Sequence, residues 1–149
     1  MINIKILLFI TLMIFNLLSK QSNKNINVCL CTIGKKENKY AIEFIEYYKK
    51  YGVDKIFLYD NNEKNDERFD QILNEYIKSG FVEIIDFRGL ERAQVKEYQD
   101  CYQKTYKEYD WIIFFDMDEF IFLRNYNNIK TFLKRKVFNK CQRIQLSIL

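Results

Sequence analysis

Two hydrophobic periods alternate along this chain. Runs of β-branched and aromatic residues are typical of buried strands, and they alternate with stretches whose apolar residues recur at the spacing of one helix face. The runs predict strands at residues 26–32, 55–59, 81–87 and 111–115, and the start of another at 143–149. The helical spacing predicts helices at residues 40–51, 69–79, 91–108 and 128–136, with Val95, Tyr98 and Tyr102 on the apolar stripe of the third.

Strands that are separated by helices indicate right-handed crossovers and a mainly parallel sheet. The chain has 149 residues, which is enough for one domain with a substantial core. We therefore expect an α/β fold in residues 26–149, preceded by a short polar linker at residues 21–25.

The first twenty residues have a different character. Residues 6–18 form an apolar run between Lys5 and Lys20, interrupted by Thr11 and Asn16. A permanent bilayer span needs about 20 apolar residues, so this run is short for a span and has the length of the apolar region of a secretory signal. Because no pair of small residues marks a cleavage site, we expect residues 1–20 to be either a signal peptide or an uncleaved signal anchor. The alternative is a buried or amphipathic first helix.

The charge distribution and the lack of histidine narrow the chemistry. The net charge is +4, from 24 basic and 20 acidic residues that are spread along the chain. Nucleic acid binding requires a concentrated basic face, so no nucleic acid partner is expected. The sequence contains no His, which excludes Ser-His, Cys-His and His-metal chemistry within this chain.

The four cysteines, Cys29, Cys31, Cys101 and Cys141, are compatible with an oxidising compartment. Four cysteines allow three complete pairings, and the sequence does not select one. Cys29 and Cys31 would point to the same face of a strand, so they are not expected to pair with each other. The spacing lacks the paired knuckles of a zinc site, and we expect at least two buried free thiols.

The most informative stretch is Trp111–Phe120, in which five large apolar residues lead directly into three carboxylates. In an open α/β sheet, ligands gather outside the carboxyl ends of the strands. Asp116 and Asp118 can therefore hold a hard divalent cation, Mn²⁺ or Mg²⁺, which can bridge a diphosphate. The Asp-x-Asp spacing alone is a weak signal, because composition gives roughly half an occurrence per chain of this length. The buried strand in front of it strengthens the signal.

Polar residues also follow two other predicted strands. Thr32 and Gly34 end the first strand, and Asp60 and Asn61 end the second. In a parallel sheet these ends share one crevice with Asp116, so all five residues are candidates for binding a nucleotide-containing ligand. Asp60 could accept hydrogen bonds from a base or ribose, and Gly34 permits close approach of the backbone. The alternative for the Asp-Asn-Asn run is an ordinary turn.

Several motifs are in register with one another and are separated by ordinary loop lengths. They are Cys31–Glu37, Phe44–Asn62, Tyr76–Gly80, Gln94, Tyr98, Asp100–Cys101 and Trp111–Phe120. Together they resemble family 92 of the glycosyltransferases over residues 27–123. The Gly-Val-Asp of residues 52–54, followed by the Tyr-Asp-Asn-Asn of residues 59–62, is far more specific than Asp-x-Asp alone.

The resemblance implies a GT-A fold, which is a Rossmann-like fold of nucleotide-diphospho-sugar transferases. It implies a UDP-sugar donor, a glycan acceptor, a divalent metal and transfer with inversion, with galactose a common donor sugar. Asp118 would hold the metal, Asp116 the metal or the ribose, and Asp60 the nucleoside, while Glu119 would orient the loop. The resemblance also implies a single-pass type II setting in the membrane of the secretory pathway, in the Golgi.

Inverting transfer needs a general base, which in GT-A enzymes usually lies after the Asp-x-Asp. Because 31 residues follow Asp118, we expect the base beyond Leu149 and regard the chain as the nucleotide-sugar-binding half of a truncated domain. Such a half is expected to bind a nucleoside diphosphate without transferring sugar. Two alternatives stay open: a module that binds a nucleotide sugar or glycan without turnover, and a phosphatase of the haloacid-dehalogenase type. Phe114–Asp118 resembles the phosphatase motif, from which Phe120 departs.

Overall fold

The computed structural model describes residues 25–138 and 140–145. Its centre is a sheet of four strands in the order β3-β2-β1-β4, and every neighbouring pair is parallel. The strands are β1 (Val28–Gly34), β2 (Lys55–Asp60), β3 (Val82–Asp86) and β4 (Trp111–Phe114). The expectation of an α/β fold with a mainly parallel sheet is confirmed.

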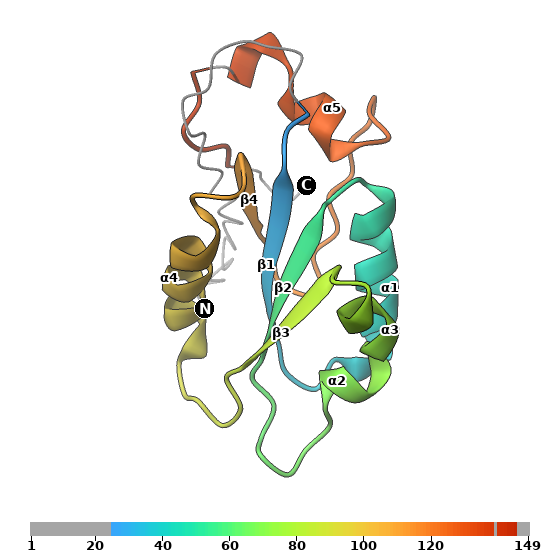
Figure 1. Ribbon diagram of the computed structural model, residues 1–149, viewed down its shortest axis with the longest axis vertical. Coiled ribbons are helices and arrows are strands. Elements are labelled where there is room, and N and C mark those ends of the chain that lie inside the picture. Colours follow the sequence, from blue (N-terminus) through green and yellow to red (C-terminus); the bar gives the residue numbers. More distant parts are fainter. Residues whose placement is uncertain (1–24, 139, 146–149) are drawn as a thin grey trace, which may run out of the picture.

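Helices cover both faces of this sheet (Figure 1). On one face lie α1 (Asn38–Lys50), α2 (Phe69–Ile72) and α3 (Asn74–Lys78), and on the other lies α4 (Ala93–Thr105). A helix α5 (Ile129–Leu133) and a 3-10 turn η1 (Lys136–Phe138) follow β4 and lie near the amino ends of the strands. Each crossover runs from one parallel strand through a helix to the next, as the alternating pattern predicted.

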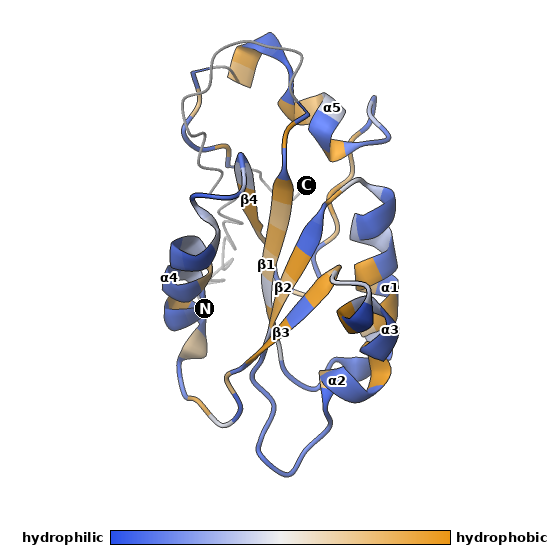
Figure 2. Ribbon diagram, in the orientation of Figure 1, coloured by the Kyte–Doolittle hydropathy of each residue, from blue (hydrophilic) through white to orange (hydrophobic). Residues whose placement is uncertain are grey.

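The sheet separates two apolar clusters. Val28 and Leu30 belong to the larger cluster, which α1 completes with Phe44 and Ile45. The intervening residues of β1 face α4 and belong to the smaller cluster. β1 is buried on both faces and appears as a mainly apolar stretch in the centre of Figure 2, whereas in the edge strand β3 only Val82 is buried.

Two predicted elements differ from the structure. The helix expected from Phe69 onward is divided at Leu73, whose φ of −103° and ψ of 15° lie outside the helical region. Phe69 and Leu73 are both fully buried, so the division accompanies the packing of both side chains into the core. The strand expected at residues 143–149 is not formed in its described part, residues 143–145.

The helix α4 turns a different face to the sheet from the one predicted. Ala93, Glu97, Cys101 and Thr105 are buried, whereas Val95 is 64% exposed. The prediction that Val95 lies on the buried stripe was wrong, because small and polar side chains at every fourth position face the sheet instead.

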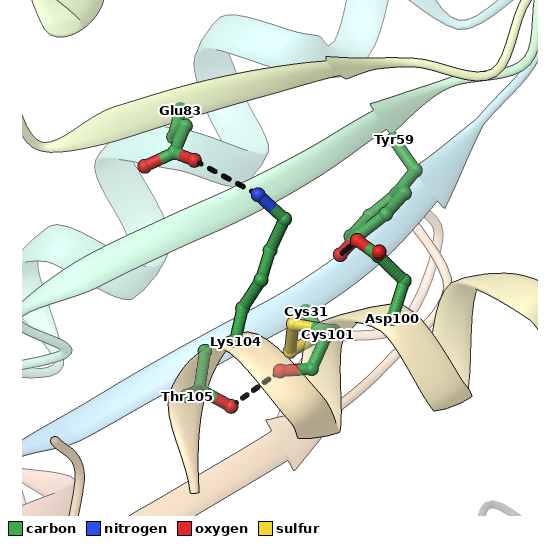
Figure 3. The surroundings of a disulfide bond; sticks show 7 residues. All are labelled: Cys31, Tyr59, Glu83, Asp100, Cys101, Lys104 and Thr105. Atoms are coloured by element: carbon green, nitrogen blue, oxygen red, sulfur yellow. Dashed lines mark hydrogen bonds and ion pairs between the residues drawn. A yellow bond between two sulfur atoms is a disulfide. The ribbon is translucent and has the colours of Figure 1, made fainter. Parts of the chain in front are cut away.

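A disulfide between Cys31 of β1 and Cys101 attaches α4 to the sheet (Figure 3). The two cysteines are 70 residues apart, and disulfides that close long loops typically contribute about 2–4 kcal/mol to stability. Cys29 is buried and free, so the expectation that it does not pair with Cys31 is confirmed. Cys141 is free but only half-buried, so just one of the two expected buried thiols is fully buried.

The predicted signal or anchor at residues 1–20 lies outside the described residues. Within the part of the chain that the structure describes, no helix is both long and apolar enough to cross a bilayer.

Candidate active site at the carboxyl edge of the sheet

The carboxyl ends of β1, β2 and β4 lie side by side because β1 is hydrogen-bonded to both other strands. Gly34 is opposite Asp60 in the β1–β2 register. Two further main-chain hydrogen bonds extend the pairing just past the strand ends, from Asn61 N–H to Gly34 C=O (3.0 Å) and from Phe115 N–H to Cys31 C=O (3.3 Å). The loops that follow these strands therefore begin at one edge of the sheet.

Gly34 allows the loop after β4 to pack directly on the end of β1. A Cβ atom at this position would overlap Met117 Sδ and would lie 2.7 Å from Phe69 Cζ. A larger residue would therefore push away the loop that carries Asp116 and Asp118. The close approach that Gly34 permits in this structure is to these two side chains.

Asp116 and Asp118 lie on a turn that is held from several sides. The Asp116 N–H donates to the Glu119 carboxylate (3.0 Å), and the Glu119 N–H donates to the Asp116 carbonyl (3.0 Å). From α1, the Tyr48 hydroxyl donates to the Glu119 carbonyl (2.7 Å) and accepts from the Ile121 N–H (3.1 Å). Asp118 is exposed and Asp116 is half-buried, so both carboxylates lie on a fixed turn at the surface.

Negative charge accumulates on this turn. Burial, together with the charge of Asp118, raises the pKa of Asp116 above its usual range. Burial and the two aspartates raise the pKa of Glu119 to about 7. The pKa of Glu37, in the loop between β1 and α1, is raised mainly by burial and further by Asp118 and Asp116. Carboxylates that repel one another favour a cation between them.

Among the described residues, no group of three or more acidic or cysteine side chains is arranged as a complete metal site. Mg²⁺ in nucleotide enzymes is often held by one or two carboxylates, with phosphate oxygens and water as the other ligands. The Asp116–Asp118 pair fits this second arrangement, in which the substrate completes the coordination.

Asp60 is buried at the end of β2, and its carboxylate is already hydrogen-bonded within the protein. Oδ1 accepts from the main-chain and side-chain amides of Asn62 (3.0 and 2.8 Å). Oδ2 accepts from the Arg88 guanidinium (3.0 Å), and the two side chains are only 6% and 10% exposed. Arg88 also donates to the main-chain carbonyls of Glu63, Lys64, Asp66 and Glu67. This buried ion pair holds the loop after β2 in shape.

Asn61 and Thr32 also direct their side chains into the protein. The Asn61 amide donates to the carbonyls of Phe87 (2.8 Å) and Leu90 (2.9 Å), which joins the loops after β2 and β3. Thr32 is 1% exposed, and its hydroxyl has no hydrogen-bond partner among the described residues. The structure thus brings all the predicted nucleotide-binding residues to one edge, but the side chains of Thr32, Asp60 and Asn61 are buried or bonded within the protein, and that of Asp116 is half-buried at the surface.

Sequence reasoning missed one residue at this edge and undervalued another. Arg88 comes two residues after β3, so the rule that selected the ends of the other strands would also have selected it. Gln94 entered only through the resemblance, and its side-chain amide donates to Asp116 Oδ1 (3.1 Å). A glutamine on a helix gives no sequence signal for such a contact.

Glu97 was not predicted either. It is fully buried in α4, and neither of its carboxylate oxygens has a hydrogen-bond partner within the described part of the chain. Burial raises its pKa to about 8, with smaller contributions from Asp116 and Asp100. The carboxyl is therefore mainly protonated at neutral pH, and being buried it cannot reach a ligand in this conformation.

The Asp60–Arg88 pair predicts a large cost for breaking it. Replacing Arg88 by Met should lower the free energy of unfolding by about 3–5 kcal/mol, because it leaves a buried carboxylate without its cation. The double variant with Asp60→Asn should cost much less than the sum of the two single changes. Urea unfolding measures all three. Arg68→Met is the control, because the Arg68–Asp70 pair is exposed and screened by water, so its loss should leave the free energy of unfolding almost unchanged. Additive effects of the Asp60 and Arg88 changes would contradict the assignment.

Glu97 predicts a pH dependence of stability. Below pH about 4.5 the carboxyl is protonated in both states; above it the unfolded chain ionises first, so the folded state loses relative stability until pH about 8. The steepest loss from one group is about 1.4 kcal/mol per pH unit. Glu97→Gln should remove this part of the decline, as measured by urea unfolding between pH 5 and pH 8.

The matched control is Glu91→Gln, an exposed carboxyl just before α4. Burial also raises the pKa values of Glu37, Asp116 and Glu119, so the comparison of wild type with the variant is needed to isolate the contribution of Glu97. Parallel pH profiles for wild type and Glu97→Gln would show that Glu97 is not buried in its protonated form.

Comparison with known proteins identifies relatives of this chain. The family model described as glycosyltransferase family 92 matches residues 24–147. A glycosyltransferase family 92 protein of Ricinus communis is 26% identical over 109 residues, which are 73% of this chain and 19% of that protein. Family 92 proteins of Oryza sativa subsp. japonica and Arabidopsis thaliana are 26% and 25% identical, over 64% and 69% of this chain and 16% and 18% of their own lengths.

The chain therefore spans less than a fifth of the length of each of these relatives. No solved structure matches it. The all-parallel sheet with helices on both faces is consistent with a GT-A-like glycosyltransferase. Since the family model covers most of the sequence, the chain belongs to glycosyltransferase family 92.

Proposed function

We propose that this chain forms the donor-binding part of an enzyme that transfers a sugar from a UDP-sugar to a glycan acceptor. Membership of the family supports glycosyl transfer in general. The observation that carries the finer proposal is the Asp116–Asp118 pair, on a fixed turn at the carboxyl edge of a parallel sheet. The proposal includes inversion at the anomeric carbon, with galactose as a candidate donor sugar.

The residues on this turn suit Mn²⁺ or Mg²⁺. Asp116 and Asp118 offer the hard carboxylate oxygens that these ions prefer. Burial and, to a smaller extent, neighbouring carboxylates raise the pKa values of Asp116 and Glu37, and a divalent cation would offset the repulsion among these carboxylates. Such an ion would neutralise the charge that develops on the diphosphate as the bond to the sugar breaks.

The chain's own residues would bind and orient the rest of the donor. Since Asp60 is only 4% exposed and already hydrogen-bonded, its contribution would be to hold the loop after β2, and the nucleoside would contact the surface of that loop. Lys35 and Lys36 follow β1 at the same edge and are exposed. They form ion pairs with Glu63 (2.7 Å) and Asp66 (3.7 Å), and exposed pairs of this kind are weak enough to exchange for a phosphate.

We also propose a location in the membrane of the secretory pathway, in the Golgi, with a single-pass type II topology. The apolar run at residues 6–18 supports entry into that pathway. The Cys31–Cys101 disulfide gives independent support, because structural disulfides form and persist in oxidising compartments.

The metal site makes the first functional prediction. Asp116→Asn and Asp118→Asn should each weaken UDP binding in Mn²⁺ about tenfold or more, because each removes a charged ligand. Neither should weaken the binding of UDP without metal, because each change removes a negative charge near the diphosphate. Calorimetry on the full chain measures both affinities. Asp110→Asn is the matched control, because this aspartate lies before β4, at the opposite end of the strand, and accepts from the Asn27 N–H.

Equal affinity of the wild-type chain for UDP with and without Mn²⁺ would refute the metal site. Release of UDP from a UDP-sugar, measured on the same samples, distinguishes an enzyme from a module that binds the donor without turnover. Hydrolysis of a simple phosphate ester would instead favour the phosphatase alternative.

The proposed topology makes the second functional prediction. With a carboxyl-terminal tag, the protein should sediment with membranes and resist carbonate extraction, because residues 6–18 would stay in the bilayer. A variant with Ile10→Lys and Ile14→Lys should lose this property. A soluble cytosolic product of unchanged mass would contradict the proposal, and a secreted product shortened by about 20 residues would indicate a cleaved signal.

A further inference from the structure

Helix α4 contacts the predicted metal ligand Asp116 from the side of the sheet opposite α1. The Gln94 side-chain amide, in the first turn of α4, donates to Asp116 Oδ1 over 3.1 Å. Across the described part of the chain, Gln94 is the one side chain that donates to this carboxylate. Among the described residues, the contact leaves the other carboxylate oxygen of Asp116 without a donor.

The Gln94 side chain is exposed, and its amide has a second hydrogen-bond partner. Its nitrogen also donates to the Tyr98 hydroxyl, one turn along the helix, over 3.0 Å. The Tyr98 ring is half-buried and lies edge-on to Phe114, the last residue of β4, with 5.2 Å between the ring centroids. The same turn of α4 therefore contacts both the end of the strand and the aspartate two residues after it.

The position of α4 relative to β4 is set through β1. Cys101, seven residues after Gln94, is bonded covalently to Cys31. Cys31 is opposite Phe114 in the β1–β4 register, and its carbonyl accepts from the Phe115 N–H (3.3 Å). One residue of β1 thus joins the helix that carries Gln94 to the strand that leads into Asp116 (Figure 3 shows the disulfide).

We propose that Gln94 is a positioning residue for Asp116, which fixes Oδ1 so that the other oxygen is presented to a divalent cation. This inference rests on the proposed function, because it assigns Asp116 to a metal. An amide suits the task because it is a neutral donor: it orients the carboxylate without supplying a positive charge that would compete with the cation. Partners that orient metal ligands typically change metal affinity by about 10–100-fold when they are removed.

The test compares Gln94→Ala with Gln99→Ala in the full chain. Gln99 lies on the same helix and is exposed, so its replacement removes an equal side chain without touching Asp116. Calorimetric titration of Mn²⁺ into each protein in the presence of UDP should give an affinity about 10–100-fold lower for Gln94→Ala than for wild type. Gln99→Ala should match wild type, and binding of UDP without metal should be the same in all three.

A second measurement requires no metal. With carboxyl-¹³C-labelled aspartate, the Asp116 resonance should shift in metal-free Gln94→Ala and remain in place in Gln99→Ala, because only the first change removes its donor. The resonance is assigned by its absence in Asp116→Asn. Unaltered thermal unfolding of Gln94→Ala would exclude a general loss of structure as the cause.

The outcomes separate the two proposals. If wild type binds Mn²⁺ with UDP and Gln94→Ala does so equally well, the positioning role is wrong while the metal site stands. An unshifted Asp116 resonance would equally overturn the positioning role. If the resonance shifts but wild type shows no dependence on Mn²⁺, the contact exists and the proposed metal function fails.

Discussion

The arrangement at this edge depends on the main-chain hydrogen bonds that β1 makes on both sides. β1 is the inner strand that pairs with both β2 and β4, so one set of registers places three carboxyl ends together. β1 is buried on both faces, and a slip of one residue would move every one of its side chains to the opposite cluster. The register is therefore strongly specified, and it determines where the loops after β1, β2 and β4 begin.

The polar groups at this edge fall into two kinds with different physical consequences. Asp60, Asn62 and Arg88 satisfy one another and the main chain of the loop after β2. A buried network of this kind is costly if any member is lost, but when complete it makes the loop rigid. Asp116 and Asp118 remain without a cationic partner among the described residues. The first kind holds the loop after β2 in shape, and the second leaves two carboxylates whose charge no described cationic side chain neutralises.

Most of the fold could be predicted from the sequence, because strands of a parallel sheet that are buried on both faces consist of continuous apolar runs. The four described strands lie within two residues of the predicted bounds, since runs of Val, Ile and aromatic residues are typical of buried strands. The ends of the helices and the division at Leu73 were harder to predict from the sequence, because they depend on which side chains fit the core. The pairing of Cys31 with Cys101 could not be predicted either, because it depends on which face α4 turns toward the sheet.

The candidate site was predictable in position and much less so in detail. Parallel topology alone implied that residues after β1, β2 and β4 would meet. The topology could not show that the Asp60 carboxylate forms an ion pair with Arg88. That contact joins residues 28 positions apart and depends on side-chain geometry. The same limit applies to Gln94, which is 22 positions from Asp116.

The helix α4 is held to the sheet differently from α1. The buried face of α1 consists of apolar residues, including Phe44 and Ile45, whereas that of α4 includes Glu97 and Thr105. A carboxyl without partners contributes little to packing and is tolerated there in its protonated form.

Besides the packing of its tyrosines on the smaller apolar cluster, α4 is held in position by specific bonds. These are the disulfide, the hydrogen bond from the Tyr59 hydroxyl to Asp100 (2.7 Å) and the ion pair of Lys104 with Glu83 (3.7 Å) (Figure 3). The ion pair is exposed and so contributes little, which leaves the disulfide and the buried tyrosine as the main restraints. Directional bonds fix a helix in both rotation and translation, whereas an apolar face tolerates small shifts. The hydrogen bond from Gln94 to Asp116 joins α4 to a separate loop, so its length depends on how firmly these bonds fix the position of the helix.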